Sequence, residues 1–115
     1  MGDELAIYRN GEKAYAFDKR EGLARMQFAY VQRMDAEMDR GIELDGERIL
    51  SPDAAQRTRF VLGQLLDAVS INDSRGIAML CRWLAQHVPT LAAIRIEDDG
   101  DEYRVELEHG ETGAA

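Results

Sequence analysis

Cys81 and His87 come closest to a catalytic pair, because a thiol is followed six positions later by an imidazole. A nucleophilic cysteine needs a base within hydrogen-bonding reach and a lowered pKa. On a helix, six residues turn the chain by roughly 600°, so these two side chains point to different sides. The residues at helical spacing from Cys81 are all apolar: Ile77, Leu80, Leu84 and Ala85. We therefore predict that Cys81 is a neutral thiol in the core and that His87 ends a helix.

Other patterns that carry known chemistry are missing from the sequence. The two histidines, His87 and His109, and the single cysteine lack the paired spacing of zinc ligands. No glycine cluster opens a helix as a phosphate-binding loop does, and no serine lies in a nucleophile elbow. We predict that the chain is not an enzyme and holds no cofactor or metal. The sequence leaves open an active site that is assembled across a dimer.

The one unusual cluster of ionisable side chains surrounds Gly100. Its members are Glu97, Asp98, Asp99, Asp101 and Glu102. If Asp99-Gly100 forms a type I′ turn, Asp98 lies opposite Asp101 and Glu97 opposite Glu102. Like charges in such positions are destabilising, so arginines, a bound cation or a basic partner would have to offset them. Oxygen ligands suit calcium, but the twelve-residue calcium-loop pattern is absent. We predict a solvated turn, with a cation site and a docking surface as alternatives.

Charge is spread unevenly along the 115 residues, whose net charge is −8. Residues 97–115 hold eight carboxylates and one arginine, whereas residues 51–96 hold three carboxylates and five arginines. An acidic chain without a basic stripe repels phosphate backbones, so nucleic acid is not expected as a partner. A nucleic-acid mimic is disfavoured because the helix-borne acids are mixed with arginines. No apolar run reaches the length of a membrane span and no secretory signal is recognisable, so we expect a cytoplasmic protein without membrane contact.

Dipeptides that favour type I′ turns predict three hairpins, at Asn10-Gly11, Asp45-Gly46 and Asp99-Gly100. In the first hairpin, Leu5 would face Ala16 and Ile7 would face Ala14. The aromatic side chains would then share the opposite face: Tyr8, Tyr15 and Phe17. The second hairpin, from Ile42 to Ile49, is short enough to be a loop. In the third, one face is apolar and the other charged, which predicts a sheet with one covered and one wet face. The apolar members are Ala92, Ile94, Ile96, Tyr103, Val105 and Leu107.

Three helices are predicted between the first and last hairpins. The first spans about residues 18–39, ends before Gly41, and carries a core stripe of Leu23, Met26, Tyr30, Met34 and Met38. The second opens at Ser51-Pro52-Asp53, with Ser51 as the cap, and buries Ala54, Thr58, Val61, Leu62, Leu65 and Val69. The third follows Asn72-Asp73-Ser74, ends before Pro89, and is apolar except along Arg75, Arg82 and Gln86. Trp83 and Met79 are predicted to lie in the core.

Two aromatic side chains fall outside the predicted core stripes. Phe28 lies off the stripe of the first helix, and Phe60 lies on the polar side of the second. Gly63, one turn after Phe60, would allow another element to approach closely. A symmetric dimer is a common way to cover such apolar patches. We therefore predict a homodimer that uses the first helix and Phe60, with packing on the first hairpin as the alternative for Phe60.

The sequence as a whole predicts an α+β fold, in which three helices pack on a small antiparallel sheet made of the N-terminal and C-terminal hairpins. Residues 1–108 would form one domain and residues 109–115 a disordered tail. The function expected is that of a non-catalytic protein–protein interaction or regulatory module whose partner has a basic or apolar surface. The alternative is a small ligand- or cation-binding domain that uses the acidic turn at residues 97–102.

Overall fold

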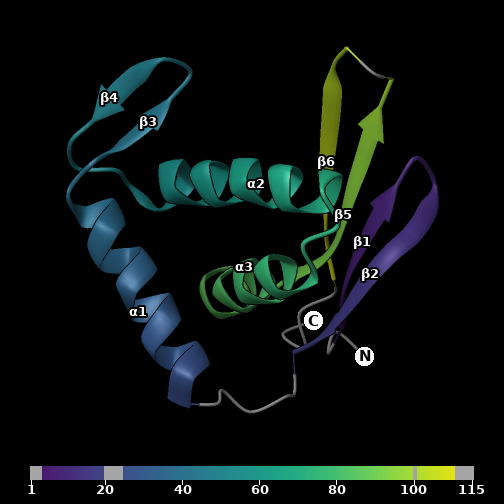
Figure 1. Ribbon diagram of the computed structural model, residues 1–115, viewed down its shortest axis with the longest axis horizontal. Helices are drawn as coiled ribbons and strands as arrows, with labels where there is room; N and C mark the ends of the chain where they lie inside the picture. Colours follow the sequence, from purple (N-terminus) through teal and green to yellow (C-terminus); the bar gives the residue numbers. More distant parts are fainter. Residues whose placement is uncertain (1–3, 20–24, 100, 111–115) are drawn as a thin grey trace. The chain divides into compact units, whose positions relative to one another are not determined.

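The computed structural model describes residues 4–19, 25–99 and 101–110, and the side chains of the middle range from residue 29 onward. The chain divides into two compact units, one formed by Met1–Gly22 with Ala85–Ala115 and the other by Leu23–Leu84. Figure 1 labels the elements along the chain. They are β1 (Glu4–Arg9), β2 (Glu12–Asp18), α1 (Arg25–Asp39), β3 (Ile42–Leu44), β4 (Glu47–Ile49), α2 (Ala54–Ser70), α3 (Ser74–His87), β5 (Leu91–Asp98) and β6 (Tyr103–His109).

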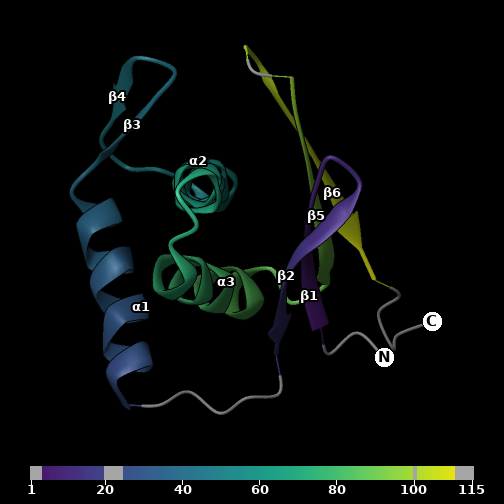
Figure 2. The ribbon, with the colours of Figure 1, turned by 45° about the vertical axis from the view of Figure 1, so that its right-hand side comes forward.

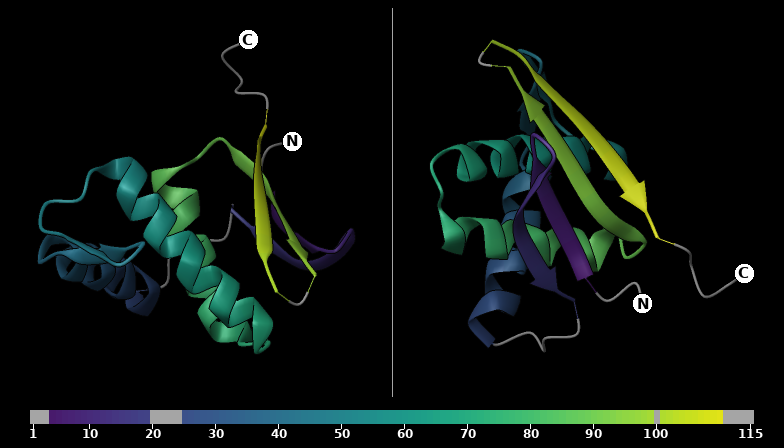
Figure 3. Two further views of the ribbon diagram at one scale, coloured as in Figure 1. Left: turned by 90° about the horizontal axis from the view of Figure 1, so that it is seen from above. Right: turned by 90° about the vertical axis from the view of Figure 1, so that its right-hand side faces the viewer.

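The first unit contains a four-stranded sheet with the strand order β2-β1-β5-β6, which Figure 3 shows face-on in its right-hand view. This confirms the α+β class and the joining of both terminal hairpins in one sheet. The sheet is mixed rather than wholly antiparallel, because its two central strands, β1 and β5, run parallel. Parallel neighbours need a long connection, and the chain between β2 and β5 supplies it. The packing of the helices on this sheet stays a prediction.

The first hairpin corrects the predicted strand register. Asn10 and Gly11 have φ values of 52° and 84°, as a type I′ turn requires. A bulge between Ile7 and Tyr8 then shifts the pairing, so that Leu5 faces Phe17 and Ile7 faces Tyr15 instead of alanines. One extra residue moves every later side chain to the other face of the sheet. The shift is favourable because it buries Phe17, which is 5% exposed, in place of the exposed Ala16.

The last hairpin also departs from the predicted register. Asp98 pairs with Tyr103 and Glu97 with Arg104, so the predicted carboxylate pairs do not form. Asp99 is not among the described residues with positive φ, and the strands are joined by a wider loop than the predicted turn. From Ala93 to Asp98 the register is offset by two residues, which leaves these side chains on their predicted faces. On the apolar face Ile96 therefore still lies beside Val105. A further shift between Leu91 and Ala93 passes over Ala92, which was predicted on the apolar face.

The second unit contains α1, the β3–β4 hairpin, α2 and α3 up to Leu84. Figure 2 views α2 nearly end-on. α1 ends at Asp39, and the N–H group of Gly41 (φ 115°) donates to the Met38 carbonyl at 3.0 Å. This confirms Gly41 as the helix C-terminal cap. The hairpin that follows turns at Asp45-Gly46, with φ values of 51° and 81°. It forms a separate two-stranded sheet.

The cap of α2 is Asp53 and not Ser51 as predicted. The Asp53 side chain accepts a hydrogen bond from the Gln56 N–H group at 2.8 Å, and the Gln56 side chain accepts one from the Asp53 N–H group at 2.9 Å. This reciprocal capping box satisfies two backbone donors at the helix start. Ser51 cannot form a capping box, because the residue three positions later, Ala54, has no side-chain hydrogen-bonding group. The local sequence therefore favours the later start.

Buried side chains of the helices correct the predicted stripes in part. In α1, Val31 is buried whereas Tyr30 is exposed, and Leu23 and the side chains of Met26 and Phe28 lie outside the described residues. In α3, Arg82 was predicted on a polar edge but is only 6% exposed. A helix that is apolar nearly all round buries its narrow polar edge as well. Trp83 is buried as predicted, and its indole N–H group donates to Asp35 of α1 at 2.8 Å.

The C-terminal strand includes His109, where the tail was predicted to begin. His109 Nδ1 lies 2.8 Å from the Thr90 hydroxyl, and the Gly110 N–H group donates to the Thr90 carbonyl at 2.7 Å. Residues 111–115 lie outside the described residues. The single-domain prediction for residues 1–108 stays a prediction.

Candidate functional site

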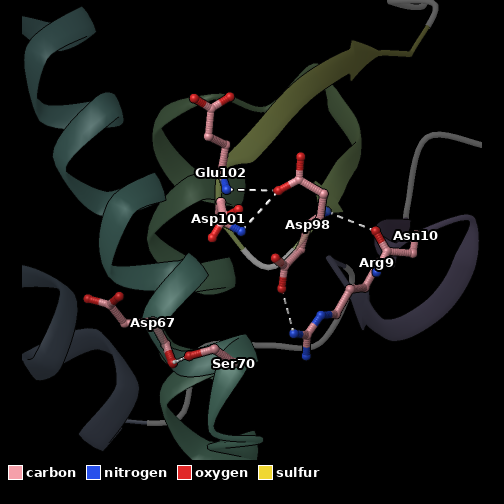
Figure 4. A network of polar contacts seen from close by, with 8 residues as sticks. Arg9, Asn10, Asp67, Ser70, Asp98, Asp101 and Glu102 are labelled. Atoms are coloured by element: carbon pink, nitrogen blue, oxygen red, sulfur yellow. Dashed lines mark hydrogen bonds and ion pairs between the residues drawn. The ribbon is translucent and has the colours of Figure 1, made fainter.

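The acidic loop, residues 97–102, is organised by a single carboxylate. The Asp99 side chain accepts hydrogen bonds from the N–H groups of Asp101, at 3.0 Å, and Glu102, at 2.9 Å. The Asp99 N–H group in turn donates to the Glu102 carbonyl at 3.4 Å. Figure 4 shows these bonds converging on one side chain beside Asp101 and Glu102. Asp99 thus replaces the predicted type I′ turn with a loop held by side chain-to-backbone bonds.

These bonds change the acidity of Asp99. The N–H groups of Glu102 and Asp101 stabilise its ionised form and lower the pKa of Asp99 below its ordinary value of 3.8. Asp99 therefore stays charged at physiological pH. Because a carboxylate with a depressed pKa is a poor proton acceptor near neutrality, Asp99 is suited to structure and not to general-base catalysis.

Two residues from β1 and its turn hold the other side of the acidic loop. Arg9 donates to the Asp98 carboxylate at 2.9 Å, and the Asn10 side chain accepts the Asp98 N–H group at 2.8 Å. The Asn10 N–H group donates to the carbonyl of Ile96 at 2.8 Å. Because β1 and β5 run parallel, the end of one strand lies beside the end of the other, and Figure 4 shows Arg9 and Asn10 directed at Asp98.

Glu97 and Glu102 line a hollow that is open to solvent, together with Asp98 and Asp99. Its volume is about 490 Å³, and its described lining is Asn10, Glu97, Asp98, Asp99, Glu102, Tyr103 and Arg104. Four of these side chains are acids and one is a guanidinium, so the hollow is net negative. Arg104 lies 3.9 Å from Glu97, and both side chains are mostly exposed, so this ion pair contributes little to stability. The hollow can therefore attract a cationic group.

The geometry of the acidic loop does not favour a metal ion. Within the part of the chain that the structure describes, no group of three or more histidine, cysteine, aspartate or glutamate side chains is arranged to hold one. Asp99 Oδ1 accepts the N–H groups of Asp101 and Glu102, and Asp98 Oδ2 accepts from Arg9. No protein-family model, curated protein or solved structure matches this chain. The candidate site therefore rests on its own geometry.

The thiol and imidazoles do not form a second site among the described residues. Cys81 has no exposed surface, and burial raises the pKa of its thiol to about 12. This agrees with the prediction of a core cysteine, because a thiolate nucleophile needs the opposite shift. His87 is exposed at the end of α3, and His109 is bonded to Thr90 at the end of β6. None of the described helices is long and apolar enough to span a membrane.

Phe60 lies in a second, smaller hollow, inside the helical unit. The hollow has a volume of about 210 Å³ and is lined by Met34, Glu37, Met38, Gly41, Ile42, Phe60 and Gln64. Phe60 is half-buried there rather than protruding. Gly63 is exposed, and a Cβ atom built on it would meet nothing within 4 Å among the described residues. The close approach predicted at Gly63 is therefore not made in the described part of the chain. The side chain of Phe28, the third predicted apolar contact, lies outside the described residues.

Proposed function

We propose that this chain is a non-catalytic interaction module whose acidic loop binds a basic segment of a partner protein. The observation that carries the proposal is the net-negative hollow beside Asp99, whose side chain accepts the Glu102 N–H group. Electrostatic complementarity of this kind steers association and selects partners by charge. We place the module in the cytoplasm as part of the same proposal, because its only cysteine is a reduced, buried thiol.

Preorganisation supports a binding role for the loop. Asp99 bonds to the Asp101 N–H group on one side, and Arg9 and Asn10 bond to Asp98 on the other. A partner then loses less free energy to ordering the loop. The carboxylates of Glu97 and Glu102 line the hollow, and Tyr103, half of whose surface is exposed, offers an aromatic face to a lysine or arginine.

The test measures binding of a fluorescent peptide rich in lysine and arginine. Replacing Asp101 by Asn and Glu102 by Gln removes two charges while keeping the backbone N–H groups that Asp99 binds. At about 0.5 kcal/mol for each exposed ion pair, the double variant should bind roughly fivefold more weakly. The matched control, Glu43→Gln with Glu47→Gln, removes the same charge from the exposed β3–β4 hairpin and should bind as the unsubstituted chain does.

Two results would reject this proposal. One is equal weakening by the control pair, because net charge alone would then explain binding. The other is the absence of any preference for the basic peptide over an acidic peptide of equal length at low salt. Far-ultraviolet circular dichroism of each variant shows that lost binding does not come from lost structure.

The second candidate is a small-ligand site in the same hollow. Its volume of about 490 Å³ falls within the usual range for small-molecule sites, and its acids favour an organic cation over an anion. A diamine that raises the melting temperature of the unsubstituted chain, but not of the Asp101→Asn, Glu102→Gln variant, would favour this candidate. Calcium should have little effect on either protein, and a clear rise with calcium that chelator reverses would revive the metal site.

A further inference from the structure

Strand β6 presents a regular, unpaired edge of the four-stranded sheet. The sheet order places β6 at one end, with β5 as its only neighbour among the described strands. The Ile96 carbonyl accepts the Asn10 N–H group, so it points away from β6. In an antiparallel ladder, the residue opposite Ile96, which is Val105, then also points its backbone groups away from β5. The N–H and C=O groups of Tyr103, Val105 and Leu107 therefore face outward along this edge.

The side chains of β6 alternate in a pattern that suits pairing. Tyr103, Val105 and Leu107 lie on one face, where Tyr103 is 51% and Leu107 is 38% exposed. Arg104 and Glu106 lie on the other face and are both exposed. The pairing with β5 is regular from residue 103 to 108. No bulge therefore twists this stretch away from a further strand.

We propose that β6 pairs with β6 of a second copy of this chain, antiparallel about a two-fold axis at Val105. In this register Tyr103 lies opposite Leu107 of the second copy, and Arg104 lies opposite Glu106 of the second copy. Symmetry repeats each pair, so the interface contains two Arg104–Glu106 pairs and one continuous apolar row. The outward backbone groups of residues 103, 105 and 107 form about six hydrogen bonds across the axis.

Charge selects this register over its neighbours. Moving the axis to Arg104 would place the two guanidinium groups opposite each other, and moving it to Glu106 would do the same with two carboxylates. Like charges directly opposite are destabilising, whereas opposite charges stabilise the pair. With the axis at Val105, the like-charged pair of Glu102 and Glu108 of the second copy falls at the ends. There Glu108 is already bonded to Arg95.

The proposal depends on the edge of the sheet, and two of its residues, Tyr103 and Arg104, also line the hollow. Val105 does not line the hollow, so Val105→Pro tests the interface separately from the proposed function. The proposal also differs from the dimer predicted through Phe28 and Phe60. The Phe60→Asp variant should therefore remain dimeric if β6 is the interface. A dimer that Phe60→Asp dissociates without unfolding would instead place the interface on the helical unit and overturn the proposal.

The decisive experiment swaps the charges of β6 in the full chain and measures sedimentation over a range of concentrations. Arg104→Glu places acids opposite acids, and Glu106→Arg places bases opposite bases. Each single variant should dimerise at least about tenfold more weakly than the unsubstituted chain. The double variant Arg104→Glu with Glu106→Arg restores two opposite-charge pairs and should dimerise again. The matched control Glu47→Arg, on exposed strand β4, should leave dimerisation unchanged.

Mixing the two single variants gives a second measurement that needs no double variant. In a mixed dimer, the glutamate introduced into one chain lies opposite the arginine introduced into the other. The unsubstituted Glu106 of the first chain then lies opposite the unsubstituted Arg104 of the second. Two proteins that are each monomeric should therefore form a heterodimer when combined. Val105→Pro removes an outward N–H group that β5 does not use, so it should block dimerisation while the monomer stays folded.

Three outcomes would overturn the proposal. The first is an unsubstituted chain that stays monomeric at the highest soluble concentration. The second is a dimer that survives both single charge swaps. The third is a pair of folded single variants that fail to form a heterodimer when mixed. If a single swap unfolds the chain, the sedimentation of the folded Val105→Pro variant decides the question.

Discussion

The two edge strands of the sheet, β2 and β6, differ in how they meet solvent. Strand β2 is bulged opposite Ile7 and Tyr8, and the bulge turns Phe17 into the core. Its outward positions at Ala14 and Ala16 carry small side chains. Strand β6 is regular, and its apolar residues Tyr103 and Leu107 remain exposed. One edge has buried its large apolar side chains, and the other has kept them at the surface.

This difference indicates that the β2 edge is less suited than the β6 edge to pairing with a further strand. A bulge increases local twist and interrupts the row of backbone donors and acceptors, which discourages a further strand. The Lys13 ammonium of β2 is also bonded to the Glu4 carboxylate, which raises the pKa of Lys13. Strand β6 has no bulge between residues 103 and 108 and begins directly after the acidic loop. The two surfaces that we propose for binding, the acidic loop and the β6 edge, therefore both lie on the β5–β6 side of the sheet.

The largest expected difference in stability between the two edge strands is at Phe17 of β2. Replacing Phe17 by Ala should lower the free energy of unfolding by about 3–5 kcal/mol, because a fully buried ring leaves a cavity opposite Leu5. Replacing the partly exposed Leu107 by Ala should cost less than about 1 kcal/mol in the monomer. Urea denaturation of both variants, at a concentration where the chain is monomeric, measures the contrast.

The Ala16→Asp variant is the control for the first hairpin. Ala16 is exposed in the bulged register, so a charge there should be tolerated within about 0.5 kcal/mol. Without the bulge, Ala16 would face Leu5 and the aspartate would be buried at a large cost. Severe destabilisation by Ala16→Asp together with a mild effect of Phe17→Ala would reject the bulged register.

The second prediction concerns the link between the two hairpins at Asp98. Asp98→Asn removes the carboxylate that Arg9 binds at 2.9 Å and should lower the free energy of unfolding by about 1 kcal/mol. Asp101→Asn, in the same acidic loop, should change it by less than about 0.5 kcal/mol. The sequence-based register predicts stabilisation by both changes, because it opposes these two carboxylates. A double-mutant cycle with Arg9→Ala measures the coupling between Arg9 and Asp98 directly. Zero coupling would mean that Arg9 does not stabilise the acidic loop through Asp98.

Local patterns explain why much of the fold could be predicted from the sequence. The turns at Asn10-Gly11 and Asp45-Gly46 form as expected, because few other residues accept positive φ at both positions. Helix α3 begins after Asp73, whose side chain accepts the Gly76 N–H group at 3.0 Å. The core role of Cys81 followed from its apolar neighbours at helical spacing. Each of these features depends on residues within one helical turn or one tight turn.

The features that the sequence did not predict are those in which two local structures fit the sequence about equally well, or in which the contact joins distant residues. The bulge in β2 exchanges alanine contacts for a phenylalanine contact, and a strict alternation pattern cannot represent that exchange. The parallel pairing of β1 with β5 joins residues almost ninety positions apart, as in the pair of Ala6 with Ala93. Asp53 competed with Ser51 for the helix cap, and the partner Gln56 decided between them.

The candidate site also combines local features, which the sequence predicted, with contacts between distant residues, which it did not. Its acidic residues were found because they are contiguous, from Glu97 to Glu102. Arg9 and Asn10 were missed because only the parallel strands bring them to Asp98. The sequence holds no signal that singles out the third turn, because Asp45-Gly46 has the same dipeptide and forms the expected turn. An Asp side chain can bond to the backbone N–H groups two and three residues later instead. Asp99 makes both of those bonds.

The smallest expected effect sharpens the role of Asp99 in the acidic loop. The hydrogen bonds from Glu102 and Asp101 lower the pKa of Asp99, so it binds its proton less readily in the folded than in the unfolded chain. Its contribution to stability is therefore present above the ordinary value of 3.8 and is lost as the pH falls through the lower, folded pKa. A nuclear magnetic resonance titration of the Asp99 carboxyl carbon should give a midpoint below 3.8. Asp99→Asn cannot titrate, so the difference between the melting curves of the two proteins should shrink as the pH falls through that window. A midpoint at or above the ordinary value, or a difference that does not depend on pH, would mean that Asp99 does not hold the loop through its ionised form.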